Sequence, residues 1–147
     1  MKKLNILLIG GTKDASNITK HIKEKYDSYI LTTTTTEYGS KLAIESGSDD
    51  TIAKPLLKDE FITLIENNEF NLLIDATHPY ASHITQTTVS LSKLFNITYI
   101  RFERPPSNLD NVDTSRVHEV TSLDEAGQLI ASDFTSGNVL HLAGANT

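Results

Sequence analysis

The sequence contains no cysteine, and this absence removes several classes of chemistry at once. Without thiols there is no disulfide framework, no thiolate nucleophile and no cysteine-based metal cluster. Positive charge is also scarce, because 13 lysines and arginines are outnumbered by 19 aspartates and glutamates, which gives a formal net charge of -6. No basic run is available to neutralise the phosphates of a duplex, so we expect no nucleic-acid partner.

Long apolar segments are missing as well. Residues 4–9 form an apolar run near the amino terminus, but no stretch approaches the roughly 20 apolar residues that a membrane span needs. The run is too short for the core of a signal peptide, and it ends in a glycine turn rather than a small-residue cleavage site. We therefore expect a cytoplasmic protein that does not engage a membrane.

Apolar, strand-like runs alternate with amphipathic, helix-like stretches along the chain. This alternation predicts the α/β fold class, with a Rossmann-like parallel sheet and helices on both of its faces. The predicted strands are, in chain order, residues 4–9, 29–33, 51–52, 71–75 and 97–101. The predicted helices contain Ala15, Ile18 and Ile22; residues 41–45; Phe61, Leu64 and Ile65; and residues 81–95.

The paired prolines of residues 105–108 interrupt this alternation, since proline continues neither a helix nor a central strand. We predict a Rossmann-like domain over residues 1–105, a linker over residues 106–115, and the truncated start of a second α/β domain over residues 116–147. The last part reads as an incomplete β-α-β unit.

That incomplete unit has two predicted strands, residues 116–120 and 138–142, around a predicted helix over residues 122–131. Ser122 is followed three residues later by Glu125, which is the spacing of a capping box. We therefore expect the helix to begin at Ser122.

A glycine turn follows the first predicted strand. Compared with the dinucleotide fingerprint G-x-G-x-x-G/A, Gly10 takes the tight-turn position, Ala15 the close-packing position, and Thr12 the place of the middle glycine. The helix that begins here offers unpaired amides and a positive dipole end, which suit a phosphate. A plain strand-to-helix turn would look similar, so both interpretations stay open.

The second strand ends in a run of threonines, residues 32–36. NAD-binding sites usually place an acid near this point to hold the ribose diol, but here the first acid is Glu37. Neutral hydroxyls, with Lys41 nearby, favour a cofactor with a 2′-phosphate and therefore NADPH. The alternative is that the threonines serve only as strand and loop before the short helix predicted at residues 41–45.

Polar groups concentrate after the strand predicted at residues 71–75. Asp75 is followed by Thr77, His78 and Tyr80 at the carboxyl edge of the sheet, where open α/β sheets bind their ligands. Such groups are costly in a crevice unless they are paired or used. We favour a functional site over the alternative in which Asp75 and Thr77 cap the next helix. In that alternative Tyr80 packs on the core and His78 is solvated.

The heptad over residues 75–81, Asp-Ala-Thr-His-Pro-Tyr-Ala, resembles the signature of the precorrin-6A reductase family. The resemblance extends to the glycine turn at residues 9–14, to Thr-Glu-Tyr-Gly at residues 36–39, and to Arg-Phe-Glu-Arg-Pro at residues 101–105. The order and spacing match the family from residue 4 to residue 105.

This resemblance implies a two-domain reductase in cobalamin (vitamin B12) biosynthesis, without metal or flavin. NADPH or NADH would deliver a hydride to a ring carbon of a tetrapyrrole substrate, precorrin-6A or cobalt-precorrin-6A. The implied cofactor-binding residues are Gly10, Gly11, Thr12, Thr34, Thr35, Thr36, Tyr38, Gly39, Asp75 and Thr77. The implied substrate-binding residues are His78, Tyr80, Arg101 and Arg104, of which His78 and Tyr80 are also the catalytic candidates.

Family members are considerably longer than these 147 residues and have a complete second domain. Residues 138–144 resemble the family's next strand and glycine turn, after which the sequence stops. We therefore expect the 147-residue chain to bind the cofactor weakly and not to reduce the tetrapyrrole.

Two other functions remain as alternatives. A different Rossmann reductase or epimerase would usually need a Tyr-x-x-x-Lys pair, but the fourth residue after each tyrosine is Ile30, Thr33, Leu42, Ile84 or Glu103. A non-catalytic nucleotide-sensing module would need only the glycine turn and not the polar heptad. A metal site is not expected, because His78 and His83 are five residues apart with a proline between them.

Overall fold

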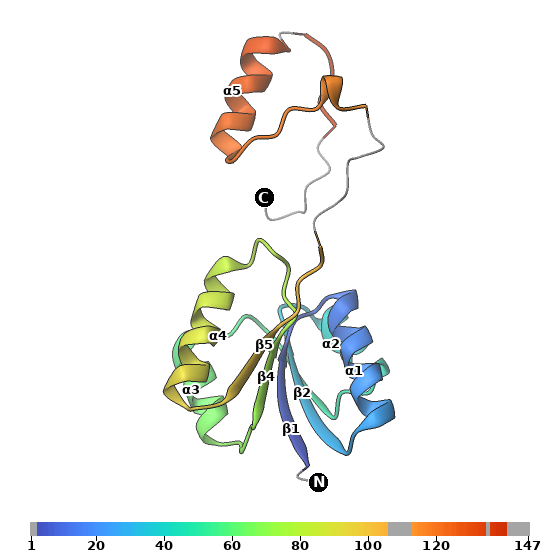
Figure 1. Ribbon diagram of the computed structural model, residues 1–147, viewed down its shortest axis with the longest axis vertical. Helices are drawn as coiled ribbons and strands as arrows, with labels where there is room; N and C mark the ends of the chain where they lie inside the picture. Colours follow the sequence, from blue (N-terminus) through green and yellow to red (C-terminus); the bar gives the residue numbers. More distant parts are fainter. Residues whose placement is uncertain (1–2, 106–112, 135, 141–147) are drawn as a thin grey trace. The chain divides into compact units, whose positions relative to one another are not determined.

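The computed structural model describes residues 3–105, 113–134 and 136–140 (Figure 1). The chain divides into two compact units, Met1–Pro105 and Pro106–Thr147. Within the described residues, no helix is both long enough and apolar enough to cross a membrane.

The first unit is built on a five-stranded parallel sheet in the order β3-β2-β1-β4-β5. Its strands are β1 (Leu4–Ile9), β2 (Ser28–Thr34), β3 (Asp50–Ala53), β4 (Leu72–Asp75) and β5 (Thr98–Arg101). Its helices are α1 (Lys13–Lys25), α2 (Glu37–Glu45), α3 (Lys58–Glu66) and α4 (Ser82–Leu94). The predicted α/β fold is confirmed, and each predicted strand of this unit forms.

Both faces of the sheet carry helices, with α1 and α2 on one side and α3 and α4 on the other (Figure 1). Towards α1, Ile6, Leu8, Ile30 and Ile74 form one buried cluster with Ala15 and Ala76. On the opposite face, strand residues pack with side chains of α3 and α4; that cluster contains Leu7, Ile9, Leu31, Phe61, Ile65, Phe70, Leu73 and Leu91. Burial on both faces explains why β1 is apolar at successive positions rather than alternating.

Helix α2 begins earlier than residues 41–45, where the sequence placed it. Strand β2 ends at Thr34, and Thr36 caps the helix because its hydroxyl accepts a hydrogen bond from the Gly39 amide at 3.1 Å. Threonine is a favourable N-cap residue, so the end of the threonine run starts the helix.

The second unit contains a 3₁₀ turn, η1 (Thr114–Arg116), and one helix, α5 (Leu123–Asp133). The predicted N-cap is confirmed: the Ser122 hydroxyl accepts from the Glu125 amide at 3.1 Å. Glu125 in turn accepts from the amide of Thr121, one residue before the position that a standard capping box uses.

The two strands predicted beside α5 are wrong as far as the structure describes them. No strand is present over residues 116–120 or over 138–140, while 141 and 142 lie outside the described residues, as do 106–112 of the predicted linker. A strand completes its hydrogen bonds only against a neighbouring strand, and the described residues of this unit provide none.

Candidate functional site

The glycine turn and the heptad are neighbours at the carboxyl edge of the sheet. Strands β1 and β4 pair in parallel with Ile9 opposite Asp75, so the segments that follow these two residues leave the sheet side by side. The strand order changes direction between β1 and β4, and such a switch point is where open α/β sheets form their ligand crevice.

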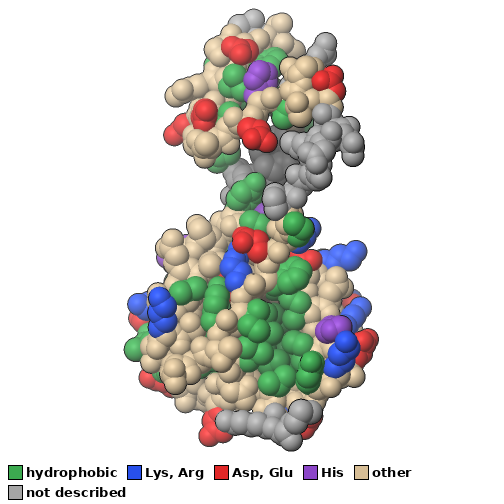
Figure 2. Space-filling view, viewed as in Figure 1, with side chains coloured by type: hydrophobic (Ala, Val, Ile, Leu, Met, Phe, Trp, Pro, Cys, Tyr) green, Lys and Arg blue, Asp and Glu red, His purple; other side chains and the backbone are tan. Residues whose placement is uncertain are grey.

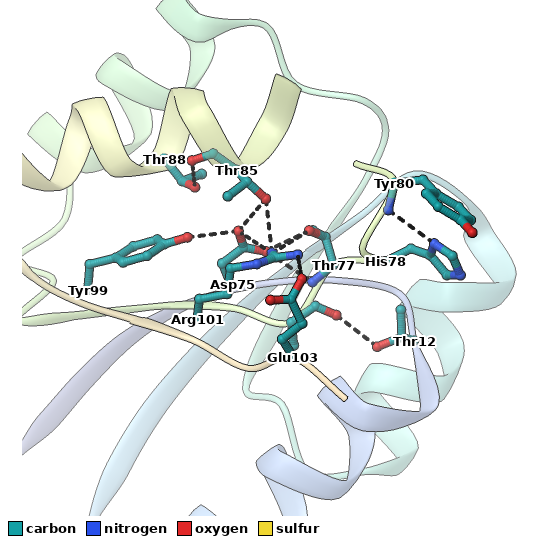
Figure 3. A network of polar contacts seen from close by, with 11 residues as sticks. Thr12, Asp75, Thr77, His78, Tyr80, Thr85, Thr88, Tyr99, Arg101 and Glu103 are labelled. Carbon is teal, nitrogen blue, oxygen red and sulfur yellow. Dashed lines mark hydrogen bonds and ion pairs between the residues drawn. The ribbon is translucent and has the colours of Figure 1, made fainter. Parts of the chain in front are cut away.

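Asp75 is the centre of a polar network at this edge (Figure 3). Its carboxylate is 0% exposed, and its Oδ1 accepts hydrogen bonds from the Thr77 amide at 3.0 Å and the Thr77 hydroxyl at 2.7 Å. Its Oδ2 accepts from the Thr85 hydroxyl at 2.8 Å, the Tyr99 hydroxyl at 2.9 Å and Arg101 Nη1 at 2.8 Å. Five donors, of which Arg101 is cationic, thus compensate the loss of water around a buried charge.

The network holds Asp75 in its ionised form. Burial by itself would raise the pKa of Asp75, but the hydrogen bonds from Thr77, Thr85 and Tyr99 outweigh burial and lower it. Burial would lower the pKa of Arg101, yet the charges of Asp75 and Glu103 raise it. Burial and the hydrogen bond to Asp75 both raise the pKa of Tyr99, so its hydroxyl stays protonated and donates.

The sequence did not identify Thr85 and Tyr99 as members of this site. Tyr99 lies two residues before Arg101 on β5, and residues two apart on a strand face the same side of the sheet. That periodicity is the signal that would have placed Tyr99 near Asp75. Thr85 gives no comparable signal, because it looks like any polar residue in the first turn of a helix.

Asp75 and Arg101, which we expected to contact cofactor and substrate, are engaged with each other. Arg101 also donates to the Thr85 hydroxyl at 2.9 Å and to Glu103 at 3.3 Å. Both side chains therefore lie within the network in the structure. Thr77 joins it too, since its amide and its hydroxyl bind the Asp75 carboxylate.

His78 and Tyr80 instead project from the heptad loop (residues 76–81), which joins β4 to α4. Both are exposed, Tyr80 to 82%, and their ring centroids lie 5.0 Å apart with the ring planes tilted by 40° (Figure 3). The His78 Nδ1 accepts from the Tyr80 amide at 3.3 Å. A neutral imidazole that accepts at Nδ1 carries its proton on Nε2, which is then free to act as a donor.

The glycine turn is joined to the heptad loop at one carbonyl. Thr12 caps α1 by accepting from the Ala15 amide at 3.2 Å, and its hydroxyl donates to the Ala76 carbonyl at 3.0 Å. Gly10 has φ +151°, and a Cβ at this position would lie 2.9 Å from the same Ala76 oxygen. The turn therefore requires glycine at Gly10 and a donor at Thr12.

The third predicted segment, from Thr34 to Gly39, approaches the glycine turn closely. A Cβ at Gly39 would lie 3.2 Å from the Cβ of Thr34, and a Cβ at Gly11 would lie 3.4 Å from the same atom. The buried Thr34 hydroxyl donates to the Thr36 carbonyl at 2.9 Å, whereas Thr35 and Tyr38 are exposed. The amino ends of α1 and α2 thus lie beside each other.

Arg104 reaches the same edge from the segment after β5. Its Nε donates to the carboxylate of Asp14, in the first turn of α1, at 2.7 Å. The arginine is largely exposed, unlike Arg101, and it neutralises the one acid of that first turn.

A family model described as "Precorrin-6x reductase CbiJ/CobK" matches residues 5–147. The chain belongs to this family. The cobalt-precorrin-6A reductase of Methanococcus maripaludis is 37% identical over 142 residues, which cover 96% of this chain and 54% of that protein. The enzyme of the same name from Methanocaldococcus jannaschii is 36% identical over 141 residues, with the same shares of 96% and 54%. The chain thus spans about half the length of the curated relatives it matches.

Two solved structures share the fold of this CbiJ/CobK-family chain. One, described as "CobK precorrin-6A reductase", has a TM-score of 0.57 and 18% identity, covering 74% of this chain and 41% of that one. The other, a putative alcohol dehydrogenase from Thermotoga maritima, has a TM-score of 0.53 and 16% identity, covering 76% and 29%. At these identities the likeness concerns the fold alone. The family resemblance drawn from the heptad is confirmed by the family model.

Proposed function

We propose that this chain binds NADPH or NADH in an enzyme that reduces precorrin-6A, or its cobalt form, during cobalamin biosynthesis. The observation that carries the proposal is the CbiJ/CobK family match over residues 5–147. When bound, the cofactor supplies a hydride, which together with a proton converts a ring C=C bond to CH–CH and leaves NAD(P)⁺. The protein's part is to bind, orient and shield the reactants.

The glycine turn fits the phosphates of such a cofactor. The first amides of α1 have no partner within the helix, and they sit at the positive end of its dipole. Gly11 is exposed and bears no side chain that would fill the space in front of them. The pairing of Arg104 with Asp14 removes the negative charge that would otherwise repel a phosphate at this helix end. We assign the phosphates to Gly10, Gly11 and Thr12.

The segment after β2 supports a preference for NADPH. Strand β2 ends in Thr34 and the next two residues are also threonines, so no carboxylate is present to hold a free ribose diol. We assign the adenosine ribose to the exposed Thr35 and Tyr38 and the capping residue Thr36. The residues between the end of β2 and Glu37 carry no acid that would repel a 2′-phosphate. Lys41, one turn after Glu37 on α2, is exposed and could attract it.

His78 and Tyr80 are the groups we assign to the nicotinamide and substrate side. They are exposed at the carboxyl edge, next to the glycine turn, and His78 carries a free donor at Nε2. We assign the proton of the reduction to the protonated form of His78, which gives up a ring N–H proton and returns to the neutral imidazole that accepts from the Tyr80 amide, with Tyr80 packed beside its ring. Arg104 is exposed, and a carboxylate of the tetrapyrrole would share its guanidinium with Asp14.

Arg101, unlike Arg104, is held by the buried carboxylate of Asp75. Its Nη1 is bound to Asp75, and among the residues that the structure describes its Nη2 reaches only the exposed Glu103, at 3.3 Å. A substrate carboxylate would have to replace Glu103 at that nitrogen. We therefore expect Arg101 to contribute mainly by keeping Asp75 ionised.

The two other functions account for fewer features of the site. A reductase or epimerase of the Tyr-x-x-x-Lys type lacks its lysine after every tyrosine of the chain. A nucleotide-sensing module needs the glycine turn alone, and it gives no reason for an exposed imidazole and phenol beside that turn.

Calorimetric titration of the 147-residue chain with NADPH and with NADH tests the cofactor assignment. Gly11→Val disturbs the fold less than a valine at Gly10 would. The nearest atom to its added Cβ is the side chain of Thr34, at 3.4 Å, and backbone atoms lie further away. Gly10→Val would also displace the Ala76 carbonyl. Gly127→Val, at a position with nothing within 4 Å of an added Cβ, is the matched control. Unchanged affinity in a folded Gly11→Val chain would remove the phosphate assignment.

Turnover is measured with the gene product that carries these residues together with whatever follows them in the reading frame. Precorrin-6A and its cobalt form are each offered with NADPH and with NADH, and cofactor oxidation is followed by absorbance. We expect oxidation in at least one combination, with NADPH the faster cofactor. No oxidation in any of the four, by a protein that binds cofactor, would contradict the proposed reaction.

A further inference from the structure

We propose that Thr85 and Tyr99 are positioning residues that hold the heptad loop through the carboxylate of Asp75. The catalytic consequence rests on the proposed function, whereas the effect on the loop is testable without it. Neither residue is exposed enough to serve chiefly as a surface group, and neither is used by the assignments above.

One carboxylate fixes both ends of the heptad loop. At the start of the loop, Oδ1 of Asp75 binds the amide and hydroxyl of Thr77. At its end, Oδ2 binds the hydroxyl of Thr85, in the first turn of α4. The N-cap position of α4 is Ala81, which provides no side-chain hydrogen bond. The hydrogen bond from Thr85 to Asp75 instead attaches the start of this helix to the end of β4.

Tyr99 fixes the carboxylate from the neighbouring strand. Its hydroxyl donates to Oδ2 of Asp75 at 2.9 Å, and with Arg101 it ties the carboxylate to β5. The heptad loop is therefore held in place relative to the sheet and not only relative to α4. Its first carbonyl, Ala76, is also bound by Thr12 of the glycine turn, so the loop has a fixed place relative to the proposed phosphate site.

His78 and Tyr80 lie within the residues that this arrangement fixes. Beyond their mutual contact, the described residues give their exposed side chains no other hydrogen bond. Their direction therefore depends on the loop backbone. Hydride and proton transfer depend steeply on such direction, so a looser loop lowers turnover more than cofactor affinity.

Amide hydrogen exchange of the 147-residue chain tests the effect on the loop. Thr85→Val and Tyr99→Phe each remove one donor from Asp75. In both variants we expect the hydrogen-bonded amides of the loop, those of Thr77, Tyr80 and Ala81, to exchange about ten-fold faster. Amides of β1 and β2 should be unchanged. Thr85→Ser keeps the hydroxyl and should restore slow exchange.

Two control variants each lose a hydroxyl that makes no hydrogen bond to Asp75. Thr87→Val lies on α4, where the hydroxyl binds only the His83 carbonyl of its own helix. Tyr29→Phe removes the hydroxyl of another partly buried tyrosine, on β2, that packs on the same face of the sheet. Neither should change exchange in the heptad loop.

A spectroscopic signature separates positioning from a general loss of stability. In the wild-type chain, nuclear Overhauser contacts should join the rings of His78 and Tyr80, whose centroids are 5.0 Å apart. We expect them to weaken in Thr85→Val and Tyr99→Phe and to persist in Thr85→Ser and the two controls. If the contacts and the loop exchange are unchanged in both test variants, the proposal is overturned.

Turnover is measured for the same variants in the gene product that carries these residues. A roughly ten-fold fall in kcat with unchanged affinity for NAD(P)H is the expected result for Thr85→Val and Tyr99→Phe. An equal fall in kcat and cofactor affinity would mean that the network supports the whole crevice. If the wild-type enzyme reduces no tetrapyrrole, the proposed function fails, while the exchange and ring-contact data still decide the positioning role.

Discussion

The sheet unit (residues 3–105) and helix α5 of the second unit differ in what covers their apolar side chains. In the sheet unit, side chains such as Leu7, Leu73 and Leu91 are buried between strands and helices. Other hydrophobic side chains gather on the face of this unit that Figure 2 shows. Helix α5 has a well-formed N-cap but no buried residue, and Leu123 is 69% exposed. Both regions have capped helices with apolar side chains, but within the described residues only the sheet unit buries such side chains in a core.

This difference shows which elements a short segment can form by itself. A helix satisfies its backbone groups within its own turns, so the Ser122 cap and the sequence after it are enough for α5. A strand satisfies its groups only against another strand, and five of them do so in the first unit.

The largest effect should come from Asp75→Ala in the sheet unit. The substitution leaves Arg101, three hydroxyls and one amide without their shared acceptor, and breaking a buried ion pair in this way costs about 3–5 kcal/mol. Urea unfolding, followed by circular dichroism, measures the free energy of unfolding. Asp27→Ala, at a highly exposed acid, is the control. A loss below about 1 kcal/mol would show that the network contributes little to stability.

Leucine truncations compare the two regions directly. Leu91→Ala removes a 0% exposed side chain from the core and should lower the free energy of unfolding by about 2–5 kcal/mol. Leu123→Ala, at a 69% exposed position of α5, should change it by no more than about 0.5 kcal/mol. Both are measured by urea unfolding of the same chain. A comparable loss in Leu123→Ala would mean that α5 belongs to a packed core.

Acid should weaken the sheet unit through Asp75. Its pKa is lowered in the folded state, so its contribution is present above the ordinary carboxyl pKa of about 4 and is lost as the pH falls through the lowered value. The difference in unfolding free energy between wild type and Asp75→Asn should therefore narrow below about pH 4. Urea unfolding at a series of pH values gives this difference, and a gap that stays constant with pH would contradict the assignment.

A smaller effect than these is expected for loss of the helix cap in the second unit, Ser122→Ala. Loss of an N-cap costs about 1 kcal/mol, and an 11-residue helix without buried side chains has little else to stabilise it. Amides of α5 should exchange about five-fold faster, while those of β1 remain as in the wild type. Ser132→Ala, in the last turn of α5, is the control. Faster exchange in β1 as well as in α5 would instead reveal coupling between the units.

Local patterns in the sequence were sufficient for much of the first unit. Continuous apolar runs identified β1 and β4, because strands buried on both faces need apolar residues on both sides. The heptad indicates the family from the sequence alone, and the family model confirms it. Helix α2 was placed four residues too late, since Thr36 was not recognised as a cap within the threonine run.

Only the tertiary structure decided which polar groups meet. Asp75, Thr85, Tyr99 and Arg101 lie on a strand end, a helix and a second strand, and their contact depends on the pairing of β4 with β5. The same dependence on a neighbour explains the missing strands of residues 116–120 and 138–140, whose sequences are adequate but unpaired in the described residues. Sequence determines what a segment can form within itself, whereas strands and buried charges are settled by the partners that the fold brings to them.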